Sequence, residues 1–349
     1  MQLSESIYGK TPEGQAVRQF TLSNNQGITV KLISFGALIT ELQTPDRNGK
    51  PDEITLGFDR LEDYLVNFPH FGCTVGRVAN RINGGTFTLN GKTCRIPQND
   101  HGRHSLHGGR KGFHKFVWDA AGRQQADSVE VEFSRVSPDG EEGFPGNLSV
   151  KTTYSLNRQN ELAIRYTATT DQPTPVNLTN HAYFNLAGKG DILGHQLLIE
   201  ADQYTPVNAD LIPTGELAGV AGTPLDFTHS HAIGEKISLI PGTPGGYDNN
   251  YVIRRQGPGR VRAARVHEPV SGRVMEIFAT QPGIQFYSGN FLDGTIAGRK
   301  GLAYQKHAGF CLETQHFPDS VNQPRFPSII LQPGQTYRHE TVHRFPVAG

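Results

Sequence analysis

The feature that most limits the folds open to this chain is an alternation of apolar and polar residues with a period of two. It recurs in residues 28–35, 129–134, 148–154, 162–169, 196–200, 274–280 and 309–313. Alternate side chains of a strand point to opposite faces, so this period is typical of β-structure. Asn90-Gly91, between TFTL and KTCRI, is a strong signal for a tight hairpin. Residues 328–345 indicate two more strands around a Pro-Gly turn.

Helical periodicity is scarce. Residues 59–67 (DRLEDYLVN) predict a short helix of two turns with Asp59 as its N-cap. The Pro/Gly cluster at 241–246 indicates a loop rather than a domain boundary, because strand patterns resume on both sides. We find no internal repeat and no long linker. The sequence therefore predicts an all-β fold, a large single-domain antiparallel β-sandwich spanning residues 1–349.

Charge and cysteine content exclude several classes of function. Lys+Arg and Asp+Glu each number 33, and no basic run stands out, so we expect neither a nucleic-acid partner nor a membrane surface. The N-terminus lacks the features of a signal peptide, and we expect a cytoplasmic protein. Cys73, Cys94 and Cys311 fit neither a disulfide framework nor a CxxC site, so we expect buried, reduced thiols.

Five stretches are unusually polar for places where strands are expected. They are GRVANRI (76–82), LHGG (106–109), NLTNHAYFN (177–185), YDN (247–249) and CLETQ (311–315). Each sets a histidine, carboxylate, arginine or asparagine beside strongly apolar neighbours. Burying such a group is costly unless it is paired or has a use. These stretches are therefore candidates for a functional site.

Taken together, the motifs resemble the aldose 1-epimerase (galactose mutarotase) family. The matching stretches, in the order expected of that family, are GRVANRI (76–82), SLHGG (105–109), DGEEGFPGNL (139–148), PVNLTNHAYFNL (175–186), YDNNYV (247–252), GIQFYSGNFLDG (283–294) and CLETQHFPDSVN (311–322). The resemblance implies a galactose-mutarotase-type β-sandwich with its active site on a concave face. It also implies an enzyme that interconverts the α and β anomers of free aldohexoses such as galactose and glucose.

The resemblance assigns roles to particular residues. It places the general base at Glu313, the general acid at His181 and a second active-site histidine at His107. The positions that match sugar-binding residues are Asn80, Arg81, Asp248 and Gln285. Two positions depart from the expected pattern: His104 stands where asparagine is expected, and Asn249 where many relatives carry histidine. Neither departure alters His107 or Asp248.

The implied chemistry needs only acid and base. A base takes the proton of the C1 hydroxyl while an acid protonates the ring oxygen, and the sugar opens to an aldehyde. Rotation about C1–C2 and the reverse transfers close the opposite anomer. A carboxylate suits the base, and a histidine suits the acid because its ordinary pKa is near neutrality. We therefore expect a monosaccharide partner, no cofactor and no metal. The expected assembly, which does not depend on this chemistry, is a monomer or homodimer.

Some of these residues can also be interpreted as purely structural. Arg81 is also interpretable as a structural ion-pair partner, a role that suits Arg77 better, and Asp248 as a turn residue. His101, His104 and His107 recur every three residues, a spacing that resembles metal ligands on a helix, but their Gly-rich setting predicts a loop instead.

Three other functions compete with mutarotation. A glycoside hydrolase would use Glu313 and Asp248 as its two carboxylates, although a partnered His181 argues against this. A carbohydrate-binding module would need no acid–base pair. An epimerase of phosphorylated hexoses would want more cations at the site than Arg81 alone.

Overall fold

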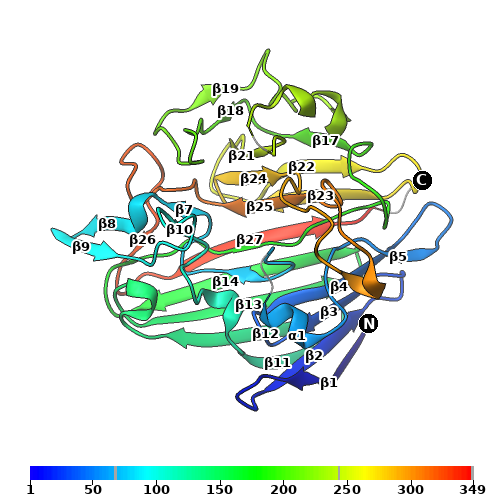
Figure 1. The fold of residues 1–349 in the computed structure, drawn as a ribbon. Coiled ribbons are helices and arrows are strands. Elements are labelled where there is room, and N and C mark those ends of the chain that lie inside the picture. The colour runs from blue at the N-terminus through cyan, green and yellow to red at the C-terminus, as the bar shows by residue number, and fades with distance from the viewer. Residues whose placement is uncertain (67–68, 243, 347–349) are drawn as a thin grey trace.

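The computed structural model describes residues 1–66, 69–242 and 244–346, and three antiparallel sheets form most of it (Figure 1). The first sheet is a five-stranded meander in chain order. Its strands are β1 (Gln2–Lys10), β2 (Ala16–Ser23), β3 (Thr29–Ile33), β4 (Leu38–Pro45) and β5 (Pro51–Glu53). Neighbouring strands of this sheet are joined by short connections, so every pairing in it is local in sequence.

The largest sheet has nine strands and draws on both halves of the chain. In spatial order they are β11 (Asp119–Gln124), β12 (Ser128–Ser137), β13 (Leu148–Asn157), β14 (Glu161–Thr170), β27 (Tyr337–Arg344), β23 (Val274–Ala279), β22 (Val261–His267), β17 (Gln196–Ile199) and β20 (His231–Ala232). The last strand of the chain, β27, lies in the middle, paired with β14 on one side and β23 on the other. It therefore joins two groups of strands that are otherwise separate.

A second five-stranded sheet and several short pairs complete the fold. The sheet has the order β19 (Ala218–Gly219), β18 (Gln203–Tyr204), β21 (Asp248–Val252), β24 (Gly283–Tyr287) and β25 (Cys311–Gln315). The short pairs are β6 (Thr74–Val75) with β16 (Thr179–Asn180), β7 (Arg81–Ile82) with β10 (Ser105–Leu106), β8 (Thr86–Leu89) with β9 (Lys92–Arg95), and β15 (Thr174–Pro175) with β26 (Ile330–Leu331). One α-helix, α1 (Leu61–Leu65), and six 3-10 turns lie within the described residues: η1 (Asn83–Gly85), η2 (Phe113–Lys115), η3 (Glu141–Gly143), η4 (Ile233–Glu235), η5 (Ile237–Leu239) and η6 (Arg299–Gly301).

Both five-stranded sheets contribute to one apolar core with the nine-stranded sheet. Phe20 of β2 meets Phe133 of β12 edge to face, with ring centroids 6.0 Å apart. Phe286 and Leu312, from the second five-stranded sheet, belong to the same cluster of buried apolar side chains as Phe20 and Phe133. Full burial of such a side chain contributes about 1.5–3 kcal/mol. The alternation that predicted strands therefore also defines the inner face of each layer.

The predicted all-β antiparallel sandwich is confirmed, and each alternating stretch overlaps a strand. The hairpin at Asn90-Gly91 is also confirmed: Leu89 pairs with Lys92, and both turn residues have positive φ, 50° and 77°. The strands predicted in 328–345 exist as β26 and β27, but they pair with different sheets.

The predicted start of the helix was wrong. Helix α1 covers only Leu61–Leu65, and its N-cap is Arg60, which makes no side-chain capping bond. The carboxylate of Asp59 instead accepts the backbone N–H of Lys300 at 2.7 Å, so a tertiary contact replaces the expected cap. Asn67 lies outside the described residues. Of the helices described, none combines the length and apolar character that a membrane span requires.

Candidate active site

The register of β21, β24 and β25 places six polar or aromatic side chains on one face of their sheet. Directly paired residues of antiparallel strands point to the same side. The pairings give two neighbouring rows across the three strands. The first row is Asn250, Gln285 and Glu313, and the second is Asp248, Tyr287 and Cys311. The alternate residues, such as Leu312, point into the apolar core. Period-two geometry alone therefore brings together three of the predicted site residues, Asp248, Gln285 and Glu313.

The strand that carries Glu313 is attached to the centre of the large sheet. The hydroxyl of Thr314, the next residue, lies 2.5 Å from the hydroxyl of Thr341 on β27, and both are buried. Leu312, on the other side of Glu313, is buried in the core. Glu313 is thus held between two inward-facing anchors, and its own side chain is only 3% exposed.

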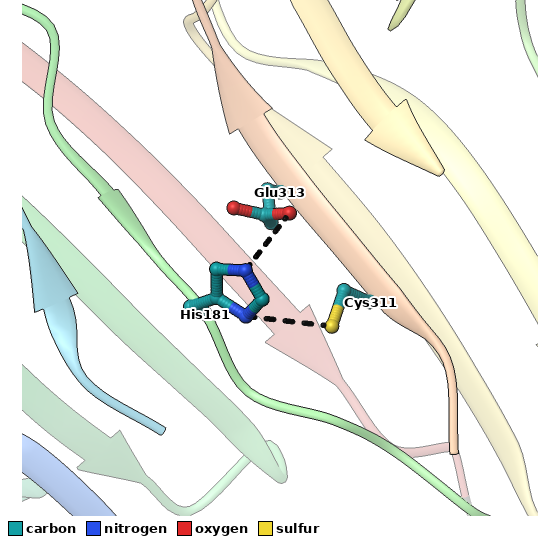
Figure 2. A group of neighbouring side chains, drawn as sticks. All are labelled: His181, Cys311 and Glu313. Carbon is teal, nitrogen blue, oxygen red and sulfur yellow. Dashed lines mark hydrogen bonds and ion pairs between the residues drawn. The ribbon is translucent and has the colours of Figure 1, made fainter. Parts of the chain in front are cut away.

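His181 reaches the same face from the segment that follows β16. Its backbone N–H donates to the Cys73 carbonyl at 2.9 Å, and its ring stacks on Tyr183 with a centroid distance of 5.3 Å. Its Nε2 lies 3.7 Å from Oε1 of Glu313, while its Nδ1 faces the sulfur of Cys311 (Figure 2). The two residues predicted as acid and base, far apart in sequence, therefore face each other directly.

Burial moves the pKa values of this pair in opposite directions. Desolvation, with the nearby charge of Asp248, raises the pKa of Glu313 well above its ordinary value. Desolvation, with the charge of His70, lowers the pKa of His181 to about 3. Both effects favour neutral side chains. A carboxylic acid with a neutral imidazole holds as many protons as a carboxylate with an imidazolium, so one proton transfer converts the neutral pair into the charged pair.

Several buried acceptors on this face have no partner. The side-chain amide of Gln285 donates to Oδ1 of Asp248 at 2.7 Å. Within the described residues, Gln285 Oε1, Glu313 Oε2 and Asn250 Oδ1 are buried without a hydrogen-bond partner. Buried polar atoms are normally satisfied, so these oxygens are available to the hydroxyl groups of a ligand. Burial raises the pKa of Asp248, and the Arg81 charge and the Gln285 bond oppose this effect.

Asn80 and His107 are locked to each other by two hydrogen bonds. The His107 backbone N–H donates to the Asn80 carbonyl at 3.1 Å, and the Asn80 N–H donates to Nδ1 of His107 at 3.2 Å. Because Nδ1 accepts, the neutral ring carries its proton on Nε2. Burial lowers the pKa of His107 well below its ordinary value, which keeps the ring neutral. Gly108 permits this arrangement, since its φ is +88° and a Cβ there would lie 1.9 Å from the Gly76 carbonyl oxygen.

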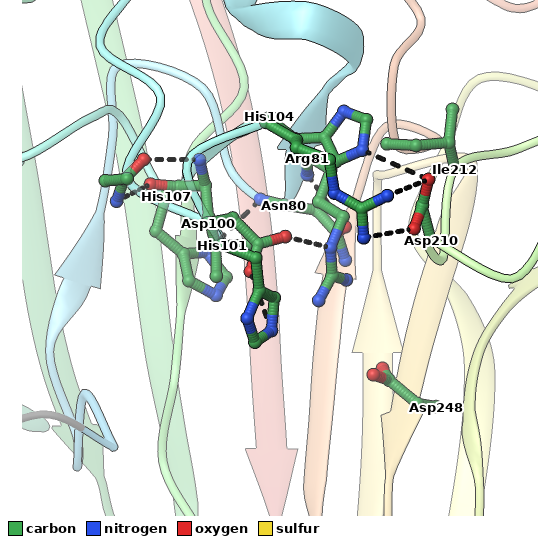
Figure 3. Close-up of polar contacts among 12 residues, drawn as sticks. Asn80, Arg81, Asp100, His101, His104, His107, Asp210, Ile212 and Asp248 are labelled. Atoms are coloured by element: carbon green, nitrogen blue, oxygen red, sulfur yellow. Dashed lines mark hydrogen bonds and ion pairs between the residues drawn. The ribbon is translucent and has the colours of Figure 1, made fainter. Parts of the chain in front are cut away.

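Arg81 is held in a salt bridge beside the site. Its Nε donates to Oδ2 of Asp100 at 2.7 Å, and both side chains are largely buried (Figure 3). The plainer reading of Arg81 as an ion-pair partner is thus correct, but its charge still acts on Asp248. Arg77 has a structural role, but the expected ion pair is not found among the described residues: its buried guanidinium donates instead to the neutral Ser137 hydroxyl and to surrounding backbone carbonyls.

The three regularly spaced histidines do not converge on one point. The His101 side chain is 80% exposed, whereas His104 and His107 are buried. The Nδ1 atoms of His104 and His107 accept backbone N–H groups of different residues, Gly84 and Asn80. The predicted loop is confirmed. His104 Nε2 faces Asp210 at 3.7 Å, so the unexpected histidine at this position contacts a neighbouring loop (Figure 3).

One group within the described residues has the composition of a metal site: His181, Cys311 and Glu313, whose ligand atoms lie within 4.8 Å of one another. Its geometry does not suit one ion. Cys311 faces Nδ1 of the imidazole and Glu313 faces Nε2, and a ring offers only one nitrogen to a given ion. Burial also raises the pKa of the Cys311 thiol well above its ordinary value, whereas metal ligation needs a thiolate. The three groups surround the ring rather than a common centre.

The sequence analysis missed two aromatic neighbours of the predicted acid, His70 and Tyr183. The His70 ring lies 5.7 Å from His181, 4.9 Å from His107 and 4.5 Å from His114, measured between centroids. Tyr183 supplies the stacking surface under His181. A signal was present for His70, because it interrupts the apolar run that leads to GRVANRI, as the other site residues interrupt theirs.

A shallow cavity of about 440 Å³ lies elsewhere, on the outer face of the nine-stranded sheet. Its charged residues are already paired: Arg165 with Glu130 at 2.6 Å and Arg260 with Glu340 at 3.0 Å. The other two carboxylates of the lining, Asp127 and Glu161, pair with Arg158 and Arg344 beside it. Such partly exposed pairs contribute little and leave no charge for a ligand. The buried face of β21, β24 and β25 is the stronger candidate for chemistry.

Comparison with known proteins gives matches over almost the whole chain. A family model described as aldose 1-epimerase matches residues 18–344. The galactose mutarotase of Bos taurus is 49% identical over 349 residues, 99% of each chain. The aldose 1-epimerase of Escherichia coli K12 is 37% identical over 339 residues, 96% of each chain. The crystal structure of an aldose epimerase homologue from C. elegans has a TM-score of 0.86 and 34% identity, covering 94% of this chain and 98% of that one.

Proposed function

The chain belongs to the aldose 1-epimerase family and is a carbohydrate epimerase, and we propose that Glu313 is its general base and His181 its general acid. The observation that carries this proposal is the 3.7 Å separation between Glu313 Oε1 and His181 Nε2. The two oxygens that exchange protons in ring opening, O1 and O5, are bonded to the same carbon. An acid and a base that reach these two oxygens must therefore lie close to each other, at the C1 end of the sugar.

The reaction begins when the pair adopts its charged form. The Glu313 carboxylate takes the proton of the C1 hydroxyl as the His181 imidazolium gives its Nε2 proton to O5. The C1–O5 bond breaks and the aldehyde forms, which leaves Glu313 protonated and His181 neutral. After rotation about C1–C2, Nε2 takes the proton of the C5 hydroxyl as O5 attacks C1, and Glu313 returns a proton to the carbonyl oxygen. Each proton transfer is reversed, so the enzyme ends as it began.

The remaining predicted residues hold the sugar. Asp248, Gln285 Oε1 and Glu313 Oε2 supply acceptors for hydroxyl groups, and the Nε2 group of Gln285 donates to Oδ1 of Asp248. The neutral His107 offers its Nε2 proton to a sugar oxygen from the opposite loop, where Asn80 fixes its tautomer. Arg81 acts through its charge beside Asp248. Positioned groups of this kind add to the rate by fixing the reacting geometry.

The substrate we propose is a free hexose such as galactose or glucose. The mutarotase of Bos taurus, at 49% identity, is named for galactose. A phosphorylated hexose is less well served, because the Arg81 guanidinium is already bound to Asp100 at 2.7 Å. Glycoside hydrolysis by Glu313 and Asp248 is not supported either, since Glu313 faces a histidine and Asp248 bonds to Gln285.

Polarimetry tests the proposal. Freshly dissolved α-D-galactose and α-D-glucose are followed with and without enzyme, and the enzyme should speed the approach to an unchanged final rotation. Glu313→Gln and His181→Asn should each lower kcat by ~10²–10⁴-fold, the usual contribution of a positioned acid or base. Both replacements are close in shape to the native side chains, so the fold should persist.

Glu340→Gln is the matched control. Glu340 is a carboxylate paired with Arg260 on the outer face of the large sheet, away from the pair. This variant should retain wild-type kcat. If Glu313→Gln or His181→Asn also retained it, the corresponding role would be refuted. Inhibition of galactose turnover by hexose 6-phosphate at low concentration would instead favour the phosphorylated substrate.

A further inference from the structure

The catalytic histidine has a second neighbour on the side away from Glu313. Nδ1 of His181 lies 3.6 Å from the sulfur of Cys311, a distance suited to a hydrogen bond with sulfur (Figure 2). Cys311 and Glu313 are alternate residues of β25, so both point to the same face, one toward each ring nitrogen. Both side chains and the imidazole are buried. The contact is thus fixed by strand geometry.

The proton transfer between Glu313 and His181 decides which atom donates in the contact between His181 and Cys311. In the neutral form of the pair, Glu313 is protonated and faces Nε2 at 3.7 Å. If Nε2 also carried a proton, it could not accept the proton of Glu313. A single proton can pass between Glu313 and Nε2 only when the other ring nitrogen keeps its own. The permanent proton of the ring therefore belongs on Nδ1, which faces the sulfur.

We propose that Cys311 is a positioning residue whose sulfur accepts the Nδ1–H of His181, so that Nε2 is the only ring nitrogen that exchanges a proton. The inference deepens the proposed function and rests on the role given there to His181. A histidine is commonly held in one tautomer by an acceptor at its other nitrogen. Here that acceptor is a neutral sulfur rather than a carboxylate.

The choice of sulfur has a chemical consequence. A carboxylate at Nδ1 would stabilise the imidazolium and make its Nε2 proton harder to release. Burial raises the pKa of the Cys311 thiol well above its ordinary value, so this neighbour stays uncharged. A thiol is a weak acceptor that orients the ring without stabilising its positive charge. His181 consequently remains a strong acid toward the ring oxygen once it is protonated.

The direct test is the tautomer of His181 in the wild-type enzyme. Long-range ¹H–¹⁵N correlation spectra of protein labelled at histidine separate protonated from unprotonated ring nitrogens. The His181 signals are assigned by their loss in His181→Asn. We expect a protonated Nδ1 and an unprotonated Nε2 in the neutral ring. The reverse pattern would overturn the proposal, whatever the activity of the enzyme.

Three variants give the kinetic test. Cys311→Ala removes the acceptor and should mix the tautomers and lower kcat by about tenfold, with KM unchanged; this change is about 1.4 kcal/mol in activation free energy. Cys311→Ser keeps an acceptor and should restore the wild-type tautomer and most of kcat. Cys73→Ala is the control, because it removes an equally buried sulfur of the same apolar cluster without touching the His181 ring nitrogens.

The outcomes separate this inference from the function on which it rests. Wild-type kcat and an unchanged tautomer in Cys311→Ala would refute the role of the sulfur while leaving mutarotation intact. Absence of mutarotation in the wild type would refute the proposed function, and polarimetry alone shows it. Should Cys311→Ala fail to fold, the wild-type spectrum and Cys311→Ser still decide the question.

Discussion

Two buried threonine hydroxyls hold the strand of Glu313 against the centre of the fold, and their coupling can be measured. Thr314 and Thr341 lie 2.5 Å apart, oxygen to oxygen, between β25 and β27. Thr314→Val leaves the Thr341 hydroxyl buried without this partner, which costs about 1–3 kcal/mol. With an unfolding entropy of about 2 cal/mol/K per residue, a 2 kcal/mol loss in this 349-residue chain lowers Tm by about 3 °C.

The double variant is the decisive comparison. Thr314→Val with Thr341→Val removes both hydroxyls and fills their space with methyl groups, so it should recover most of the lost stability. We expect a coupling energy of about 1–2 kcal/mol from urea unfolding of the four proteins. We also expect kcat to fall in the single variants more than in the double variant, because Glu313 adjoins Thr314. Strictly additive stability losses would refute the anchoring role of the pair.

Three further predictions concern the loop, the base and the buried histidines. Gly108→Ala should lower the free energy of unfolding by more than about 1 kcal/mol and also lower kcat, because its Cβ would meet the Gly76 carbonyl oxygen. Gly102→Ala is the control: its φ is also positive but the space around it is open, so it should lose less stability in urea unfolding and leave kcat unchanged. Asp248→Asn removes a charge that raises the pKa of Glu313, so the acid limb of the kcat/KM profile should move to lower pH; a shift to higher pH would contradict this. Burial lowers the pKa of His343 to about 4, from about 6.5 in the unfolded chain. The free energy of unfolding should therefore be unaffected by this histidine above pH 6.5 and should fall by about 3 kcal/mol as the pH drops toward 4, because the unfolded chain binds the proton more tightly. His343→Phe should therefore flatten the decline in urea stability between those pH values, and an unchanged slope would show that other groups dominate.

Local patterns predicted the strands, and the family resemblance assigned the candidate site residues, but neither predicted how the strands associate. Alternation identified β25, and the resemblance placed the candidate base at Glu313. The pairing of Asp248 with Tyr287, and of Gln285 with Glu313, joins strands far apart in the chain. Such long-range register follows from tertiary packing, so the hydrogen bond between Gln285 and Asp248 could not be foreseen.

The shortest elements escaped prediction for a different reason. Arg81 lies in β7 and the residues just before His181 in β16, and each strand has two residues. Two residues cannot display a period. The helix signal at Asp59 failed because a tertiary contact with Lys300 replaced the local cap. Cys311 was expected to be an inert buried thiol, and only its position beside Nδ1 of His181 suggests more.

The central position of β27 has a consequence for how the polypeptide is made. The first sheet is a local meander and can form while the rest of the chain is still being synthesised. The nine-stranded sheet cannot close until Tyr337–Arg344 has left the ribosome, because among the described strands β27 is the one that pairs with both β14 and β23. Until then each presents an unpaired edge, the kind of surface that leads nascent chains to aggregate. Premature termination before residue 337 should therefore yield a product that requires a chaperone or is degraded, rather than a weakened enzyme.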